Sequence, residues 1–256
     1  MVASRKTMYV AAAAFTVLLV CLPQVRGAPT LDLTGVGSSG FVNGAYFEQI
    51  DPSSTGTGVI MSFVRIQANP IEQGYNTDYR PVQFDEHTDH NFTRSLLLSN
   101  VPIVEKNSVL YREFLLDIHE AGGTQGQGLL ALDTIEIYLA NSGNLTGYPT
   151  FGGAATKIFD LDSGGDAWIL LDGNLTSGSG AGDMFAYIPN NLFTGGDSVY
   201  LYSHFGESEG IGSSGTFEEW AVRIGVPTED VPAPGALLLG VIGGNFVVWL
   251  RRRKLV

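Results

Sequence analysis

Hydrophobic and polar positions alternate along the middle of this chain with a period of two residues. Ile135 and Ile137 fall on one side of an extended segment, while Glu136 and Tyr138 fall on the other. Such alternation is typical of a half-buried strand in an antiparallel sheet. The pattern predicts strands and turns, and it indicates no helix from Leu31 to the start of the C-terminal tail.

Nine segments show this alternation or a short run of β-branched and aromatic residues, and clusters of Gly, Asn, Asp and Ser separate them. The segments are residues 45–50, 58–68, 109–120, 133–141, 156–162, 166–172, 183–189, 197–207 and 216–224. Sheets with one buried face close most simply as two packed layers. We therefore expect an all-β fold with a single domain over residues 28–228, an antiparallel β-sandwich or jelly roll.

One glycine pattern suggests a cofactor site, but its context argues against it. Gly35, Gly37 and Gly40 match the spacing G-x-G-x-x-G. A dinucleotide site needs a helix to begin at the last glycine, whereas Asn43-Gly44 predicts a β-hairpin there. We interpret the glycines as a loop.

The first 27 residues have the pattern of a secretory signal peptide. Arg5 and Lys6 precede an apolar run over residues 8–22, and Gly27 supplies a small residue at the cleavage site. The run is short for a membrane span. An uncleaved anchor is the alternative.

Residues 229–256 have the pattern of a membrane-sorting tail. Residues 235–250 carry no charge and would form a helix of about 24 Å, shorter than the roughly 30 Å hydrocarbon core. Prolines at 232 and 234 precede the run, and a basic cluster follows it at 251–254. An ordinary type I anchor is the alternative, whereas a GPI signal would end in an apolar tail without arginines.

This ending resembles the PEP-CTERM sorting tail of exported bacterial proteins. The residues that carry the resemblance are Val231, Pro232, Ala233, Pro234, Arg251, Arg252 and Arg253. Ala233 stands where the family's motif has glutamate. The resemblance implies an exosortase-type processing protease, removal of the tail near Pro234, and release or attachment at the surface of a cell that makes extracellular polysaccharide. Residues 178–224 are similar to a block found near the end of many proteins with such tails.

The charge of the chain limits the partners it can bind, and its cysteine content limits how the domain can be stabilised. Residues 28–250 hold 7 basic residues and all 26 acidic ones, a net charge of −19. Such a chain repels phosphate backbones, which excludes nucleic acid as a partner, and it attracts divalent cations. Cys21 is the only cysteine and falls in the expected signal peptide. Without disulfides, the exported domain depends on its core or on bound ions.

Asp160, Asp162 and Asp166 form a candidate structural Ca²⁺ loop. They stand in a glycine-bearing turn between two expected strands, and calcium binds several carboxylates on a flexible loop. Gly164 occupies a position where a third side-chain donor usually falls, so a solvated acidic turn is the alternative.

His87 and His90 stand among Asp85, Glu86 and Asp89. Such a cluster could bind a transition metal if a helix or tight turn brought the two rings together. We interpret the segment as an exposed loop. No histidine of the chain stands near a nucleophile elbow, and we expect no enzymatic activity.

Tyr200 and Tyr202 are the candidate carbohydrate-binding residues. They alternate with Val199 and Leu201, so they face away from the expected core. Exposed tyrosine rings on a flat sheet can stack on pyranose rings. The alternative is that this face is also covered, with each hydroxyl bonded to a partner.

The sequence thus predicts an exported cell-surface or extracellular-matrix protein of structural or adhesive type, held in the membrane by its tail until processing. A carbohydrate-binding module for extracellular polysaccharide is the alternative. A surface glycoside hydrolase using paired carboxylates is a third candidate.

Overall fold

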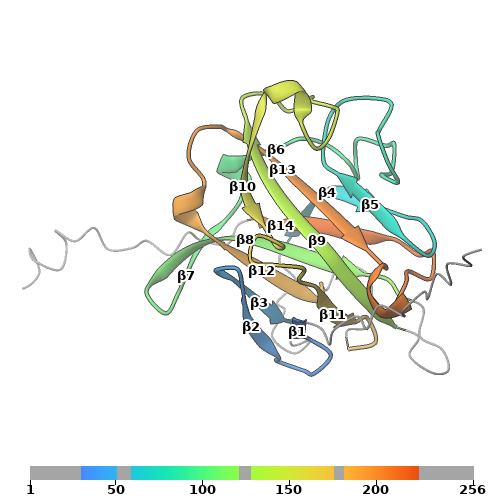
Figure 1. Cartoon of the computed structure of the whole chain (residues 1–256). Helices are drawn as coiled ribbons and strands as arrows, with labels where there is room; N and C mark the ends of the chain where they lie inside the picture. The colour runs from blue at the N-terminus through green and yellow to red at the C-terminus, as the bar shows by residue number, and fades with distance from the viewer. Residues whose placement is uncertain (1–29, 51–58, 121–127, 176–181, 225–256) are drawn as a thin grey trace, which may run out of the picture.

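The computed structural model describes residues 30–50, 59–120, 128–175 and 182–224, which form two β-sheets (Figure 1). Between the described strands every pairing is antiparallel except that of β1 with β11. The expected all-β, mostly antiparallel fold is confirmed.

Sheet A has the strand order β1-β11-β9-β13-β5, with β10 paired to β9 and β6 paired to β13. Its strands are β1 (Leu31–Asp32), β5 (Glu72–Tyr75), β6 (Leu96–Leu97), β9 (Leu129–Ala140), β10 (Ala155–Asp160), β11 (Ile169–Asp172) and β13 (Ser198–Phe205). The long strands β9 and β13 run side by side through its middle (Figure 1).

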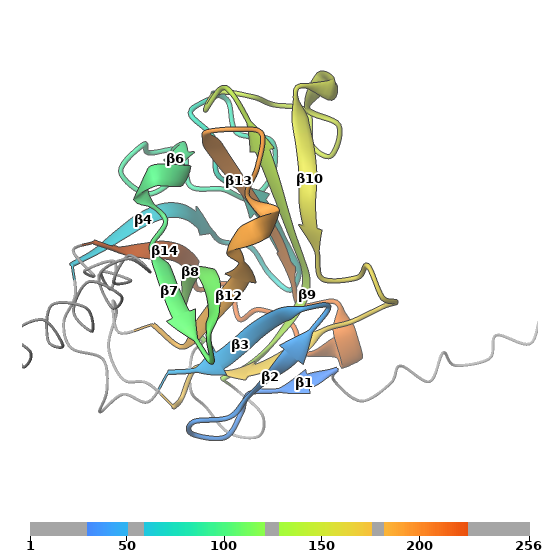
Figure 2. The same cartoon turned by 90° about the vertical axis from the view of Figure 1, so that its left-hand side faces the viewer.

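Sheet B has the order β2-β3-β12-β8-β14-β4, with β7 paired to β8. Its strands are β2 (Ser39–Val42), β3 (Ala45–Gln49), β4 (Val59–Ile66), β7 (Ile103–Lys106), β8 (Val109–Ile118), β12 (Met184–Pro189) and β14 (Glu218–Ile224). Short 3₁₀ turns lie at Leu98–Asn100, Phe151–Gly153, Asn190–Leu192 and Ser208–Gly210. The view turned by 90° separates β9 and β10 on one side from β4, β7 and β14 on the other (Figure 2).

One hydrophobic core fills the space between the two sheets. Ile135 and Ile137 of β9 enter it from sheet A, and Phe114 and Trp220 enter it from sheet B. Trp220 is fully buried, and its indole N–H donates to Ser203 Oγ of β13 at 3.0 Å. Burial of these side chains stabilises the pair of sheets, and the buried hydrogen bond fixes how they meet.

Each of the nine expected segments contains a strand. The hairpin at Asn43-Gly44 is also confirmed, because it joins β2 to β3 and both residues have positive φ, at 48° and 83°. That backbone matches the twist of the flanking strands and favours Asn-Gly. The six-residue glycine pattern before it leads into β2, as a loop should.

No helix within the described residues is long and apolar enough to cross a membrane. The expected signal peptide at residues 1–27 and the sorting tail at residues 229–256 lie outside the described part of the chain.

Candidate functional site

Two of the three aspartates of the candidate calcium loop, Asp160 and Asp162, are engaged with the protein's own groups. Asp160 ends β10, where one oxygen accepts the N–H of Asp162 at 2.9 Å and the other pairs with Lys157 Nζ at 2.7 Å. Asp162 accepts the N–H of Ala167 at 2.9 Å, and Asp166 is exposed. Within the described ranges no three His, Cys, Asp or Glu side chains are grouped as ligands of one metal ion. The contacts of these aspartates are those of an acidic turn.

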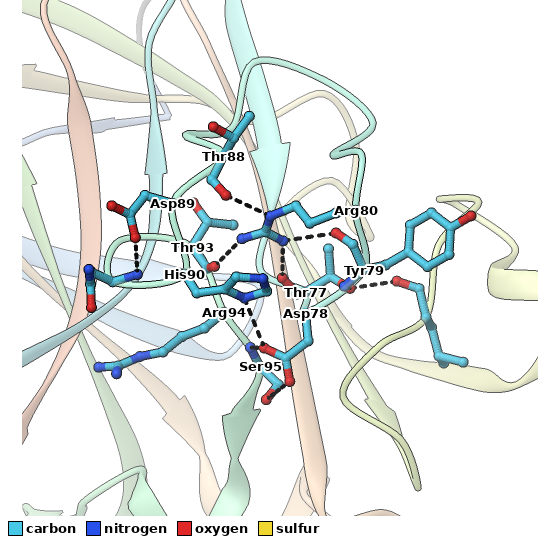
Figure 3. Close-up of polar contacts among 12 residues, drawn as sticks. Thr77, Asp78, Tyr79, Arg80, Thr88, Asp89, His90, Thr93, Arg94 and Ser95 are labelled. Carbon is cyan, nitrogen blue, oxygen red and sulfur yellow. Dashed lines mark hydrogen bonds and ion pairs between the residues drawn. The ribbon is translucent and has the colours of Figure 1, made fainter.

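The histidine-bearing segment is a loop between β5 and β6, organised by Arg80 (Figure 3). Its guanidinium donates to four main-chain carbonyls, those of Thr77, Tyr79, Thr88 and Thr93, at 2.5–2.8 Å. Guanidinium is suited to this role because it presents several donors in a fixed plane. Loop 77–95 is thus held by one side chain bonded to the backbone at both of its ends.

The two histidines of this loop point to different partners. His90 lies 4.0 Å from Asp78, which also accepts the N–H and hydroxyl of Ser95 (Figure 3). His87 accepts the N–H of Asp89 at 3.2 Å and packs edge-on against Phe92. The two rings do not form a pair, and the interpretation as a loop agrees with these contacts.

Tyr200 and Tyr202 do face away from the core, but their rings are buried. They expose 1% and 6% of their surface, in contrast to the open platform expected from the sequence. The ring of Tyr148 stacks on Tyr202 with centroids 3.9 Å apart, and Phe151 lies 5.1 Å from Tyr200. The rings on this side of sheet A, which we call the aromatic cluster, are Tyr75, Phe84, Tyr138, Tyr148, Phe151, Tyr200 and Tyr202.

Each hydroxyl of the two tyrosines has a partner. Tyr200 donates to the carbonyl of Ser142 at 2.6 Å, and Tyr202 bonds to Gln73 Oε1 at 2.8 Å. Burial raises the pKa of both tyrosines to about 12. This side of the sheet is therefore covered, as in the alternative interpretation, because loop 77–95 and the segment 141–153 close over it.

The outer face of sheet B instead carries the exposed ring of Phe41, beside the half-buried Tyr46 and the buried Tyr187, which exposes 3% of its surface. Phe41 is 64% exposed and packs against Tyr46 at 4.9 Å, and Tyr46 stacks on Tyr187 at 5.8 Å. These residues are opposite one another in β2, β3 and β12, so they form a row across three strands. We call Phe41, Tyr46 and Tyr187 the aromatic strip.

Charged side chains flank this strip. Lys106 lies over the ring of Tyr187 at 4.3 Å and pairs with Glu48 at 2.5 Å. Beyond Tyr187, Glu113 is buried and forms a two-bonded ion pair with Arg223. No long alternating run marks the strip in the sequence, because Phe41 stands in the glycine-rich start of the hairpin. The signal available in the sequence was that Phe41 and Tyr46 alternate, on either side of the turn, with the core residues Val42, Ala45 and Phe47.

The sorting-tail residues Val231, Pro232, Ala233, Pro234, Arg251, Arg252 and Arg253 lie outside the described residues, so that expectation stays a prediction. Comparisons with protein-family models, with curated proteins and with solved structures found no match.

Proposed function

We propose that this chain is an exported cell-surface or extracellular-matrix protein with a structural or adhesive role. The observation that carries the proposal is the arrangement of the two ends around an acidic all-β body. A basic and apolar segment stands at the front, and Pro232-Ala233-Pro234, an apolar run and an arginine cluster stand at the end. In this proposal a signal peptide exports the chain, and an exosortase-type protease processes the tail after its helix has stalled in the membrane.

In this proposal the body acts through its surface and not through the residues that the sequence singled out as possible ligand sites. Arg80, Asp160 and Asp162 bond to the fold itself, and the rings of Tyr200 and Tyr202 are buried in it. What such a body offers to a partner is its surface. A two-sheet body with an acidic surface suits a matrix of hydrated polysaccharide, where it stays soluble between contacts.

The intact mass of the native protein from cell-surface and culture fractions tests the proposal. We expect the first 27 residues to be absent and the chain to end near Pro234. A mass that extends through Val256 in every fraction would show that the tail is an ordinary anchor, and the sorting part of the proposal would fail.

Carbohydrate binding is the second candidate, and the aromatic strip favours it. Phe41 presents an exposed ring on a sheet face, with Tyr46 beside it and the charges of Glu48 and Lys106 at the edge. Aromatic rings give large contact area at low entropic cost, and flanking polar groups can bond sugar hydroxyls.

Retention on the host's own polysaccharide tests this candidate. We expect Phe41→Ala to weaken retention at least severalfold, because it removes the exposed ring without touching the core. Val36→Ala is the matched control, since Val36 is equally exposed at 64% and lies in the preceding loop. Equal retention of both variants and the unmodified protein would contradict a role for the strip.

A further inference from the structure

Two glutamates enter the interior from opposite sheets. Glu72 begins β5 opposite Phe205 of β13, and Phe205 lies in the core. Glu218 begins β14 and shares its inner face with Trp220, two positions on. Both side chains are fully buried, at 0% exposure. The two carboxyl groups, one from sheet A and one from sheet B, interact at one end of the core, where each affects the pKa of the other.

The oxygens of this pair are short of partners. Glu72 Oε2 accepts the N–H of Ala68 at 3.0 Å, but Glu72 Oε1 and both oxygens of Glu218 have no hydrogen-bond donor from the protein. Two ionised carboxylates cannot donate to each other, whereas a protonated Glu218 can donate to Glu72. None of the ion pairs among the described residues involves either glutamate. Buried charge without a partner is strongly unfavourable, so either a proton or a bound cation must neutralise the pair.

A third glutamate adds negative charge beside them. Glu120 follows β8, is 8% exposed, and accepts the N–H of Ser214 at 2.9 Å. Burial raises the pKa of Glu72 to about 7 and raises the pKa of Glu218 well above its ordinary value, and the charge of Glu120 raises both further. We call Glu72, Glu120 and Glu218 the glutamate cluster.

Hydrogen bonds from Ser213 hold the segment before β14 against the segment before β5, beside the cluster. The N–H of Ser213 donates to the carbonyl of Pro70 at 2.8 Å, and Ser213 Oγ donates to the carbonyl of Ala68 at 3.2 Å. The segment before β5 and the segment before β14 are thereby joined beside the two carboxyl groups. Hydroxyl and carbonyl oxygens thus lie in the segments that flank the glutamates.

We propose that the unpartnered oxygens of Glu72 and Glu218 hold a calcium ion that ties the two sheets together at this end of the core. Calcium takes six to eight oxygen ligands in an irregular shell and accepts carboxylates, hydroxyls, carbonyls and water together. The site uses two carboxylates as direct ligands, since no three acidic or histidine side chains are grouped as ligands in the described residues. Glu120 contributes charge from its position beside them. Magnesium fits less well, because it demands a regular octahedron and releases water reluctantly.

Calcium titration of the chelator-treated, full-length chain tests this site. At a pH above the raised pKa of Glu72, we expect calcium to raise the melting temperature and to bind one ion per chain with a Kd of about 10⁻⁴ to 10⁻³ M, the range of extracellular modules. Magnesium at equal concentration should give a smaller shift. Sorting of the chain to the surface has no bearing on this result.

Glu218→Gln separates calcium from a purely structural effect. The amide is neutral and nearly isosteric, so the metal-free variant should be at least as stable as the unmodified chain above neutral pH. Its affinity for calcium should fall by roughly tenfold or more, because affinity follows the number of charged ligands. Glu209→Gln, an exposed acid in the loop before β14, should bind calcium normally. Asp162→Asn should also bind normally, which excludes the Asp160–Asp166 turn as the site.

Terbium luminescence on the unmodified chain gives a second readout that needs no variant. Trp220 lies on the inner face of β14 beside Glu218 and should sensitise the emission of a terbium ion bound there, with calcium competing it away. If millimolar calcium neither raises the melting temperature nor displaces terbium, while acid alone stabilises the chain, protons neutralise the cluster and the calcium site is wrong.

Discussion

The ring of Tyr148 covers much of the aromatic cluster. Its ring lies nearly parallel to that of Tyr202, with 15° between the planes, and it also contacts Tyr75, Phe84, Tyr138 and Phe151. Its hydroxyl donates to Glu136 at 2.9 Å, and burial together with that carboxylate raises its pKa. The residue therefore joins ring stacking to a charge-assisted hydrogen bond at one position.

Tyr148→Ala should lower the free energy of unfolding by about 2 kcal/mol or more, because it exposes Tyr202 and leaves a gap among four other rings. Tyr79→Ala, which removes an exposed tyrosine from the facing loop, should change it by no more than about 0.5 kcal/mol. Urea denaturation of both variants measures the difference. Equal stability of the two would mean that the cover contributes little.

Alternation along β13 predicted correctly which way Tyr200 and Tyr202 face, but it could not predict their burial. Period two assigns a residue to one side of a sheet. Whether that side is wet depends on what lies over it, here loop 77–95 and segment 141–153. Neither has a hydrophobic period of its own, and Arg80 organises the first through main-chain carbonyls that no side-chain pattern reveals.

At the scale of elements, the loop from Gly206 to Phe217 approaches the backbone before β5 very closely. A Cβ added to Gly212 would lie 2.8 Å from the carbonyl oxygen of Pro70 and 2.9 Å from its Cβ. The same carbonyl accepts the N–H of Ser213. This contact joins the segments that precede β5 and β14, one strand from each sheet, and it can form only because the loop has no side chain there.

Gly212→Ala should lower the melting temperature and cost about 1–3 kcal/mol, since the obstacle is a backbone atom of the segment before β5, which can move only with the main chain around it. Gly35→Ala is the control, because its added Cβ meets only Ser38 Cβ at 3.9 Å. That variant should remain within about 0.5 kcal/mol of the unmodified chain. Differential scanning calorimetry compares them, and an unchanged Gly212→Ala would argue against a rigid contact at Pro70.

The elements that the sequence failed to predict are the shortest ones. β1 and β6 have two residues each, and β2, β5 and β7 have four, too few for a period to be recognised. β5 is also unusual in content, with glutamate, glutamine and glycine before a tyrosine. Such a strand exists because β13 offers an edge to pair with, and only the folded chain supplies that edge.

At the scale of the whole molecule, the buried glutamates of the interior show how far a sequence can predict a buried polar site. The glutamate cluster could have been half predicted, because Glu218 shares the period-two face of Trp220 and Val222 in "FEEWAV". An acidic residue at a core-facing position indicates a buried carboxyl group, which the fold must pair, hydrogen-bond or keep neutral. Its partner Glu72 belongs to the other sheet, and pairing between sheets depends on tertiary packing that a single sequence does not encode locally.

Several carboxyl groups in the described part of the chain have raised pKa values, which sets the sign of their contribution to the pH dependence. Burial raises the pKa of Glu72 from 4.5 to about 7, that of Glu218 well above 4.5, and those of Glu86 and Asp162 in the same direction. At pH values between the pKa of such a group in the unfolded state and its higher pKa in the folded state, the native state binds more protons than the unfolded state. Its free energy of unfolding therefore falls as pH rises.

In a chelator-containing buffer, the stability contributed by Glu72 should be fully present below pH 4.5 and lost as pH rises through about 7. One pKa unit corresponds to about 1.4 kcal/mol, so this group alone changes the free energy of unfolding by a few kcal/mol. Urea denaturation across this window measures the slope. The double variant Glu72→Gln, Glu218→Gln should flatten it, since amides do not titrate, while Glu209→Gln should leave it unchanged. A slope that survives the double variant undiminished would assign the effect to Glu86, to Asp162 or to the overall negative charge of the chain, whose self-repulsion also grows with pH, and not to the glutamate cluster.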